Sequence, residues 1–112
     1  MFAEYTACMS KTGYIPPAAV TAEARRGLEL RKKFGRGGTA VGLARGKQLA
    51  GRKVVTESDI KRIYSYFARH AVDKKGKNFD NPLRPSNGKI AWLLWGGDAG
   101  AKWAHTIRKS LK

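Results

Sequence analysis

The sequence predicts an all-α protein, a compact bundle of four to five short helices joined by glycine-rich connections. Apolar residues recur at helical spacing in several separate segments, and clusters of glycine and proline divide these segments. No strand-like alternation of comparable quality occurs along the chain. Because 112 residues is the common size of one domain, we expect residues 1–14 to form an N-terminal arm and residues 15–112 a single helical domain.

The first helix is predicted over residues 18–34. Pro17 suits the first turn, where its missing N–H has no intrahelical partner to lose. Val20 and Ala24 begin an apolar stripe, and the arginines and lysines of the segment fall largely outside it. Gly35 follows where a left-handed stop is expected.

A second, shorter helix is predicted from Thr39, its N-cap, through Leu49. The third helix has the clearest start, because Thr56 followed by Asp59 approximates a capping box. Its stripe contains Ile60, Ile63 and Phe67, and we expect it to end near Val72.

Residues 73–87 are polar and contain glycine and proline, so they predict a long exposed loop. Residues 90–95 are apolar almost all round, as in a short buried helix, and two glycines end that segment. Asp98 is then expected to cap a last helix whose apolar stripe includes Trp103 and Ile107.

Positive charge dominates the composition. Lys and Arg number 23 against 8 Asp and Glu, which gives a net charge of +15. A polyanionic partner would relieve this self-repulsion, and nucleic acid, most of all DNA, is the partner that we expect. A merely solubilising surface and a basic face that docks on an acidic protein are the alternatives.

The expected contacts with nucleic acid lie on the first two helices and their connection. The glycine-rich turn can present backbone N–H groups to a phosphate, although a plain linker would look the same. We expect the surplus of positive side chains to be gathered on one side of the fold. The expected contact residues are Arg25, Arg26, Arg31, Lys32, Lys33, Arg36, Gly37, Gly38, Arg45, Lys47, Arg52 and Lys53.

Aromatic side chains suggest a base-stacking platform as another possibility, but their positions on apolar stripes favour core packing for most of them. Phe67, Trp92 and Trp103 belong to such stripes. Tyr66 lies off the main stripe, so we expect it to be the most exposed of the rings.

Several kinds of site are not expected. His70, His105 and Cys8 lack metal-ligand spacing. We find no convergent acid, base or nucleophile, so we expect neither a catalytic residue nor a cofactor, and no enzyme. The longest apolar run, residues 90–95, is too short to cross a bilayer, and the single Cys8 has no internal disulfide partner.

Several motifs together resemble a small basic domain of tailed bacteriophages. The most specific is Ile-Ala-Trp-Leu-Leu-Trp-Gly-Gly-Asp-Ala-Gly at residues 90–100, and the similarity covers residues 14–104. The other matching segments are residues 15–17, 25–31, 35–39, 65–70 and 73–76. That domain occurs free-standing and attached to larger phage proteins, including proteins that resemble prohead proteases.

The resemblance implies a phage origin, with the host cytoplasm during infection and the virion as places of action, and it supplies no catalytic residue. We therefore expect a phage accessory protein that binds nucleic acid through phosphate contacts. The alternative is a protein-interaction module that docks on an acidic phage or host protein. A small enzyme acting on nucleic acid is a third hypothesis.

Overall fold

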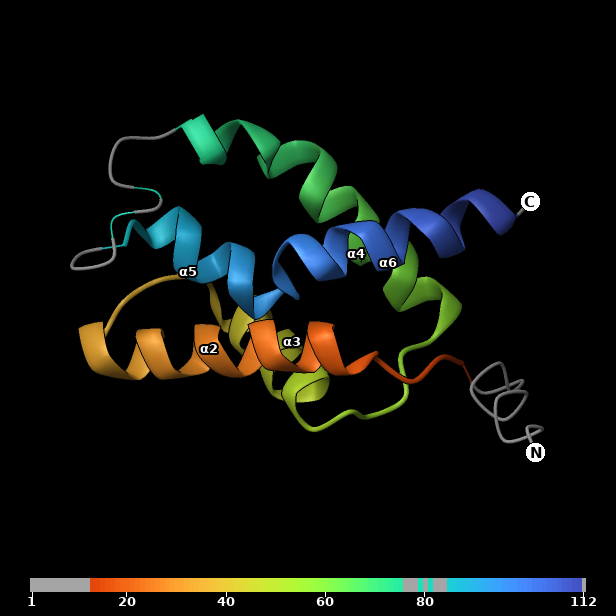
Figure 1. Cartoon of the computed structure of the whole chain (residues 1–112), viewed down its shortest axis with the longest axis horizontal. Helices are drawn as coiled ribbons and strands as arrows, with labels where there is room; N and C mark the ends of the chain where they lie inside the picture. The colour runs from red at the N-terminus through yellow and green to blue at the C-terminus, as the bar shows by residue number, and fades with distance from the viewer. Residues whose placement is uncertain (1–12, 76–78, 80, 82–84, 112) are drawn as a thin grey trace.

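The computed structural model describes residues 13–75, 79, 81 and 85–111, and it confirms the all-α bundle. Within these residues the chain forms five α-helices and one 3-10 helix, and its only strand-like feature is an isolated bridge (Figure 1). In chain order the elements are α2 (Ala18–Phe34), α3 (Ala40–Ala50), α4 (Glu57–His70), η1 (Ala71–Lys75), α5 (Asn87–Leu94) and α6 (Gly97–Ser110).

The isolated bridge ties the chain before α2 to the chain before α4. The Tyr14 N–H donates to the Val55 carbonyl at 2.7 Å, and the Val55 N–H donates back to the Tyr14 carbonyl at 2.8 Å. Tyr14, which the sequence assigned to the arm, is therefore attached to the helical domain. Residues 1–12 of the predicted arm lie outside the described residues.

Helix α2 has the bounds that the sequence predicts. Pro17 stands at its N-cap in an extended conformation, and Gly35 at its C-cap takes a φ of 65°. In this left-handed conformation the Gly35 N–H donates to the Arg31 carbonyl at 2.7 Å, and a residue with a Cβ would be strained there.

Side-chain caps begin α3 and α4 as predicted. The Thr39 hydroxyl accepts a hydrogen bond from the Gly42 N–H at 3.2 Å. The Thr56 hydroxyl accepts from the Asp59 N–H at 3.0 Å, and the Asp59 carboxylate accepts from the Thr56 N–H at 3.2 Å. Both halves of the capping box are thus present.

Three details after α4 differ from prediction. The α-helix ends at His70, and the chain tightens into the 3-10 helix η1 instead of continuing as an α-helix to Val72. Phe79, in the segment predicted as an exposed loop, is only 3% exposed and joins the core. Asp98 does not cap α6, because Gly96 occupies the N-cap with a φ of 114° and Asp98 lies in the first turn.

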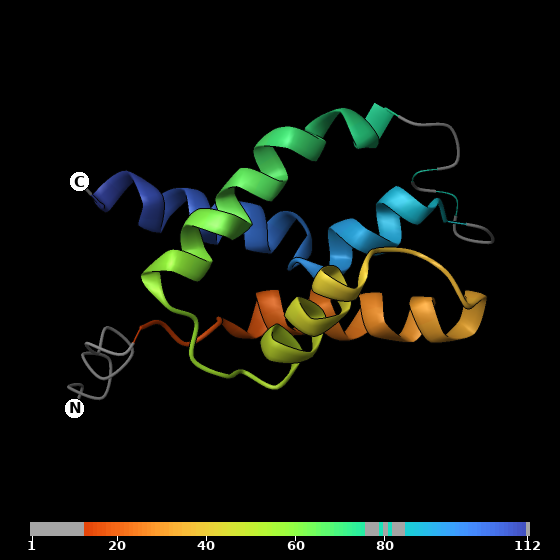
Figure 2. The same ribbon diagram turned by 180° about the vertical axis from the view of Figure 1, so that it is seen from behind.

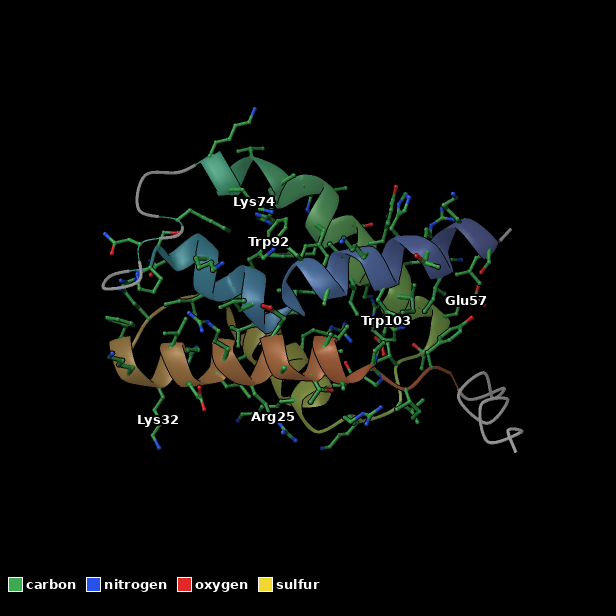
Figure 3. All side chains as sticks on the ribbon, in the orientation of Figure 1. Arg25, Lys32, Glu57, Lys74, Trp92 and Trp103 are labelled. Atoms are coloured by element: carbon green, nitrogen blue, oxygen red, sulfur yellow. The ribbon has the colours of Figure 1, made fainter. Side chains whose placement is uncertain are left out.

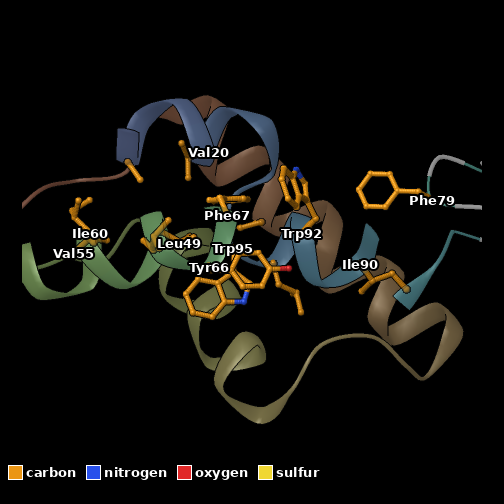
Figure 4. Close-up of a cluster of buried hydrophobic side chains, with 14 residues drawn as sticks. Val20, Leu49, Val55, Ile60, Tyr66, Phe67, Phe79, Ile90, Trp92 and Trp95 are labelled. Atoms are coloured by element: carbon orange, nitrogen blue, oxygen red, sulfur yellow. The ribbon is translucent and has the colours of Figure 1, made fainter. Parts of the chain in front are cut away.

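The core forms where α2 packs against α3, α5 and α6 and where α4 packs against α6. Figure 4 shows its side chains, among them Leu49, Ile60 and Ile90, which are completely buried. Gly27 permits a close approach of α2 to α5, since a Cβ at this position would lie 2.7 Å from the Leu94 backbone nitrogen. Seen from behind, α4 crosses the face of the molecule opposite to α2 (Figures 1 and 2).

Candidate nucleic-acid interface

The predicted cations of α2 occupy its outer edge. Arg25 and Lys32 both point away from α5 and α6 (Figure 3). Because they are seven residues apart, the helix separates them by about 10 Å along its axis. Arg26 and Lys33 are exposed on the same helix. One helix therefore presents a row of cations about two turns long.

Two arginines connect this row with the end of α3. The Arg25 Nε donates to the Ala50 carbonyl at 3.3 Å, and the Arg52 Nε donates to the Pro16 carbonyl at 3.0 Å. Ala50 is the last residue of α3, where carbonyl groups carry partial negative charge and favour a nearby cation. The exposed Lys47 and Lys53 belong to the same end of α3 and the segment after it. We call this set the α2–α3 face; it comprises Arg25, Arg26, Lys32, Lys33, Lys47, Arg52 and Lys53.

The α2–α3 face carries little negative charge. Among the residues that the structure describes, ion pairs involve Arg45, Lys61, Arg62 and Lys74, and none involves a cation of this face. The exposed Glu29 lies on the same stretch of α2, but it forms no ion pair with these cations, so none of the seven is paired with a carboxylate of the described chain.

The glycine-rich turn between α2 and α3 is held against α5. The Arg31 Nε donates to the Gly37 carbonyl at 3.1 Å, and Arg36 donates to the Pro85 carbonyl at 2.9 Å and to Asn87 Oδ1 at 2.5 Å. A Cβ on Gly37 would lie 2.6 Å from the Ile90 side chain. Packing against α5 thus explains the glycine, and Arg31 and Arg36 are committed to contacts within the fold.

Gly38 has the same role as its neighbour, because a Cβ there would lie 2.8 Å from Leu94 Cδ1. The sequence left both a phosphate-binding turn and a plain linker open, and the observed contacts account for the two central glycines without a ligand. Arg25 and Arg52 also donate to backbone carbonyls but remain exposed, whereas Arg31 and Arg36 are half-buried. We therefore leave Arg31, Arg36, Gly37 and Gly38 out of the α2–α3 face.

Arg45 requires a correction to the predicted interface. Its side chain is 10% exposed, and its Nη1 lies 3.1 Å from Asp59 Oδ1 and 2.6 Å from Gln48 Oε1. The guanidinium also lies over the ring of Trp95, 5.3 Å from the centroid. An arginine that is paired and stacked in this way belongs to the internal structure and not to the α2–α3 face.

Positive charge is not restricted to one side of the fold, contrary to expectation. Each α-helix in the described structure carries Lys or Arg, including Lys61 and Arg62 on α4 and Lys102 and Lys109 on α6. The net charge of +15 therefore creates more than one basic surface. The α2–α3 face is one of them.

A second basic surface is a cleft of about 960 Å³ between α3, α4 and α5. Figure 2 shows the molecule from the side on which α4 lies in front. From α3 come Val41 and Arg45, and from α5 come Ala91 and Trp95, the latter at its C-terminal end. The α4 side supplies Lys61, Arg62, Ser65, Arg69 and His70.

A column of stacked side chains lies beside the cleft and lines part of it. His70 stacks on Tyr66 with ring centroids 4.5 Å apart, and Tyr66 stacks on Trp95 at 4.5 Å and 5°. The Arg45 guanidinium also lies over the Trp95 ring. Tyr66 is only 5% exposed, so the prediction that it is the most exposed ring is wrong. A second face of α4 is covered by α5, which periodicity within α4 does not reveal.

Asp59 supports the column from outside the cleft lining. Its burial raises the carboxyl pKa. Hydrogen bonds from the Thr56 N–H, Gln48 and Arg45, together with the Arg45 charge, lower the pKa by more than burial raises it, so the pKa lies below its ordinary value. The carboxylate is therefore ionised at neutral pH and fixes the Arg45 guanidinium over Trp95.

The sequence contained one signal for the α4 side of the cleft. Ser58, Lys61, Ser65 and Arg69 recur at three- and four-residue steps, which places them on one helical face. A solvated face of an amphipathic helix has the same pattern. The cleft could not be predicted from α4 alone, because α3 and α5 form its other walls.

A separate polar cluster joins η1, α5 and α6. Asp98 Oδ1 accepts hydrogen bonds from Lys74 Nζ at 3.0 Å and Trp92 Nε1 at 2.9 Å. The Lys74 hydrogen bond, the Trp92 N–H and the charges of Lys74 and Lys89 outweigh partial burial and lower the pKa of Asp98. Asp98 thus fixes α6 to the preceding elements.

No three His, Cys, Asp or Glu side chains of the described residues gather closely enough to hold a metal ion. Cys8 lies outside these residues. None of the described helices combines the length and apolar character that crossing a membrane requires. The chain matches no protein-family model, no curated protein and no solved structure.

Proposed function

We propose that the protein binds nucleic acid, with DNA as the proposed ligand, through phosphate contacts of the α2–α3 face. The observation that carries this proposal is a row of exposed cations with no carboxylate partner among the described residues, on two helices that pack together. A DNA backbone places phosphates along such a row, and each contact releases a condensed counterion.

The residue types of the α2–α3 face support contact with phosphates more than recognition of bases. Lysines predominate at the exposed positions, and flexible ammonium groups act as point charges toward phosphate oxygens. Sequence-independent binding that weakens steeply with salt is the expected behaviour. We further propose, from the resemblance of residues 90–100 to tailed-phage domains, that this activity serves a phage during infection in the host cytoplasm or in the virion.

The test compares two triple variants that change net charge equally. R26E/K32E/K47E reverses three exposed cations of the α2–α3 face, and K75E/K102E/K109E reverses three exposed cations on η1 and α6. Affinity for a 30-base-pair duplex is measured by fluorescence anisotropy over a range of salt concentrations. Circular dichroism spectra establish that both variants remain helical.

We expect the α2–α3 variant to lose about a hundredfold or more in affinity and the slope of log K against log salt to become shallower by about 3. The α6-side variant should lose much less. Equal losses would assign binding to total charge and contradict the α2–α3 face. Unchanged DNA binding by the first variant would refute the role of the face outright.

A further inference from the structure

We propose that the cleft between α3, α4 and α5 binds an acidic amphipathic segment of a partner protein. This site lies on the side of the molecule where α4 crosses, and it shares no residue with the α2–α3 face. The proposal is therefore independent of nucleic-acid binding, and either can fail alone.

The cleft offers an apolar anchoring surface. Val41 is 63% exposed and lines the cleft together with Ala91 and the edge of Trp95. Across the cleft, the described Cα atoms of α3 and α4 all remain more than 8 Å apart, and the Arg45–Asp59 ion pair joins the two helices in place of close backbone packing. A large aliphatic side chain at such exposure is stabilised when a partner removes it from water.

The rim of the cleft is positive. Lys61, Arg62 and Arg69 line the α4 side, and the described lining contains no carboxylate. The rim is partly paired, since Lys61 Nζ lies 3.4 Å from Glu57 and Arg62 Nη1 lies 3.8 Å from Asp59, with both cations about half or more exposed. Exposed pairs of this kind are weak and readily exchange partners.

The spacing of the rim suits carboxylates on a helix. Arg62 and Arg69 are seven residues apart, which is about 10 Å of rise along α4. Carboxylates seven residues apart on a partner helix that lies along α4 have the same spacing, and the apolar side of that helix then faces Val41. This is the helix-in-groove mode of recognition with charge complementarity at the rim.

The aromatic side chains argue against single-stranded nucleic acid in the same place. Binding of single strands relies on aromatic faces on which bases stack. Here Tyr66 stacks on both His70 and Trp95, and Arg45 lies over the Trp95 ring. Tyr66 is 5% exposed and Trp95 9% exposed, so neither ring offers an open face to a base, and the cleft favours aliphatic side chains.

The experiment selects ligands from a displayed library of random 12-residue peptides. The full-length protein is the bait, and K61Q/R62Q/R69Q is used for counter-selection. Selected peptides are synthesised, and their affinities are measured by isothermal titration calorimetry. We expect them to combine Asp or Glu with Leu, Ile, Phe or Trp, and to lose about tenfold or more in affinity for K61Q/R62Q/R69Q.

Two matched controls locate the binding. Val41→Asp should weaken the selected peptides about tenfold or more, whereas Val72→Asp should not. Val72 is 65% exposed, as much as Val41, but it does not line the cleft. K32Q/K33Q/K47Q removes the same charge as the rim variant from the α2–α3 face and should leave peptide affinity unchanged.

Three outcomes overturn the proposal. One is a selection without peptides that prefer the wild-type protein over K61Q/R62Q/R69Q. Another is a set of selected peptides that bind Val41→Asp and the wild-type protein equally well. The third is binding of a 15-nucleotide oligothymidine that is lost with K61Q/R62Q/R69Q and kept with K32Q/K33Q/K47Q, because this result assigns the cleft to a nucleic-acid strand.

Discussion

Trp95 lies face to face with Tyr66, with ring centroids 4.5 Å apart and ring planes inclined by only 5°. One ring belongs to α4 and the other stands at the C-terminal end of α5. Relatively few backbone contacts join these two helices, so the stacked pair provides much of the connection between them. The pair also shapes the cleft.

Removal of the Tyr66 ring should destabilise the fold. We expect Tyr66→Ala to lower the free energy of unfolding by about 3–5 kcal/mol, because a large buried aromatic leaves a cavity beside Trp95. Urea denaturation followed by circular dichroism measures the change. Tyr64→Ala is the comparison, since Tyr64 is half-buried and its stacking on His105 spans 6.0 Å. A smaller loss for Tyr66→Ala than for Tyr64→Ala would contradict the assigned role.

The approach of α2 to α5 depends on Gly27. Gly27→Ala would bring a Cβ to 2.7 Å from the Leu94 nitrogen and 2.9 Å from the Leu93 carbonyl carbon, both backbone atoms. We expect the two helices to be pushed apart at a cost of about 1–3 kcal/mol, despite the better helix propensity of alanine. Thermal unfolding measures the loss.

Gly35→Ala separates this steric effect from backbone strain. Gly35 has a φ of 65° with no atom within 4 Å of an added Cβ, so its replacement costs only the left-handed conformation, about 1–2 kcal/mol. Gly35→Asn should recover part of that loss, since asparagine tolerates this region better. If Gly27→Ala were stabilising, the close contact between α2 and α5 would be disproved.

Substitution of Arg45 should lower stability and substitution of Lys47 should lower DNA affinity, although the two residues are only two positions apart. Arg45→Ala removes the ion pair with Asp59 and the guanidinium over Trp95, so we expect a loss of about 2–4 kcal/mol in unfolding free energy. Lys47→Ala should leave stability unchanged within about 0.5 kcal/mol, because it is exposed on α3.

The DNA-binding assay gives the converse expectation. Lys47→Ala removes a proposed phosphate contact and should weaken duplex binding, whereas Arg45→Ala should affect binding little at temperatures where the variant is folded. A strong and specific loss of DNA affinity with Arg45→Ala, without a loss of stability, would restore Arg45 to the predicted interface.

Stability should depend on the ionised state of Asp98 at acidic pH. Its pKa in the folded protein is lowered by Lys74 and the Trp92 N–H, whereas in the unfolded chain it returns to its ordinary value of about 4. The carboxylate therefore stabilises the fold above that value, and the stabilisation is lost as the pH falls through the folded pKa.

Asp98→Asn should accordingly unfold at a lower temperature than the wild-type protein at pH 7, with the difference decreasing toward pH 3. Glu29→Gln, an exposed substitution on α2, is the control. A difference that remained constant from pH 7 to pH 3 would show that ionisation of Asp98 does not stabilise the fold.

Local chemistry made the helix boundaries predictable. Thr56 with Asp59 and Gly35 after α2 act through bonds to backbone groups a few residues away, so their patterns can be read directly from the chain. The prediction that Asp98 caps α6 was wrong for a local reason. Its position after two glycines is typical of a cap, but Gly96 stands at the N-cap and the helix begins at Gly97, and Asp98 bonds instead to Lys74 and Trp92.

The candidate sites were less predictable because they depend on which helices lie next to one another. Arg45 has the same charge as its neighbours on α3, and only the arrangement of α4 and α5 places it between Asp59 and Trp95. Tyr66 is buried for the same reason. The cleft combines three helices far apart in sequence, so no single segment contains its pattern.

The reciprocal pairing of Tyr14 with Val55 has a consequence for the order in which parts of the fold open. Its two hydrogen bonds close the stretch of chain that contains α2 and α3, and the two amide protons share one hydrogen-bonded site. Native-state hydrogen exchange should therefore report the same opening free energy at both amides. Opening of the Tyr14–Val55 bridge should precede separation of α2 and α3 from the remaining helices.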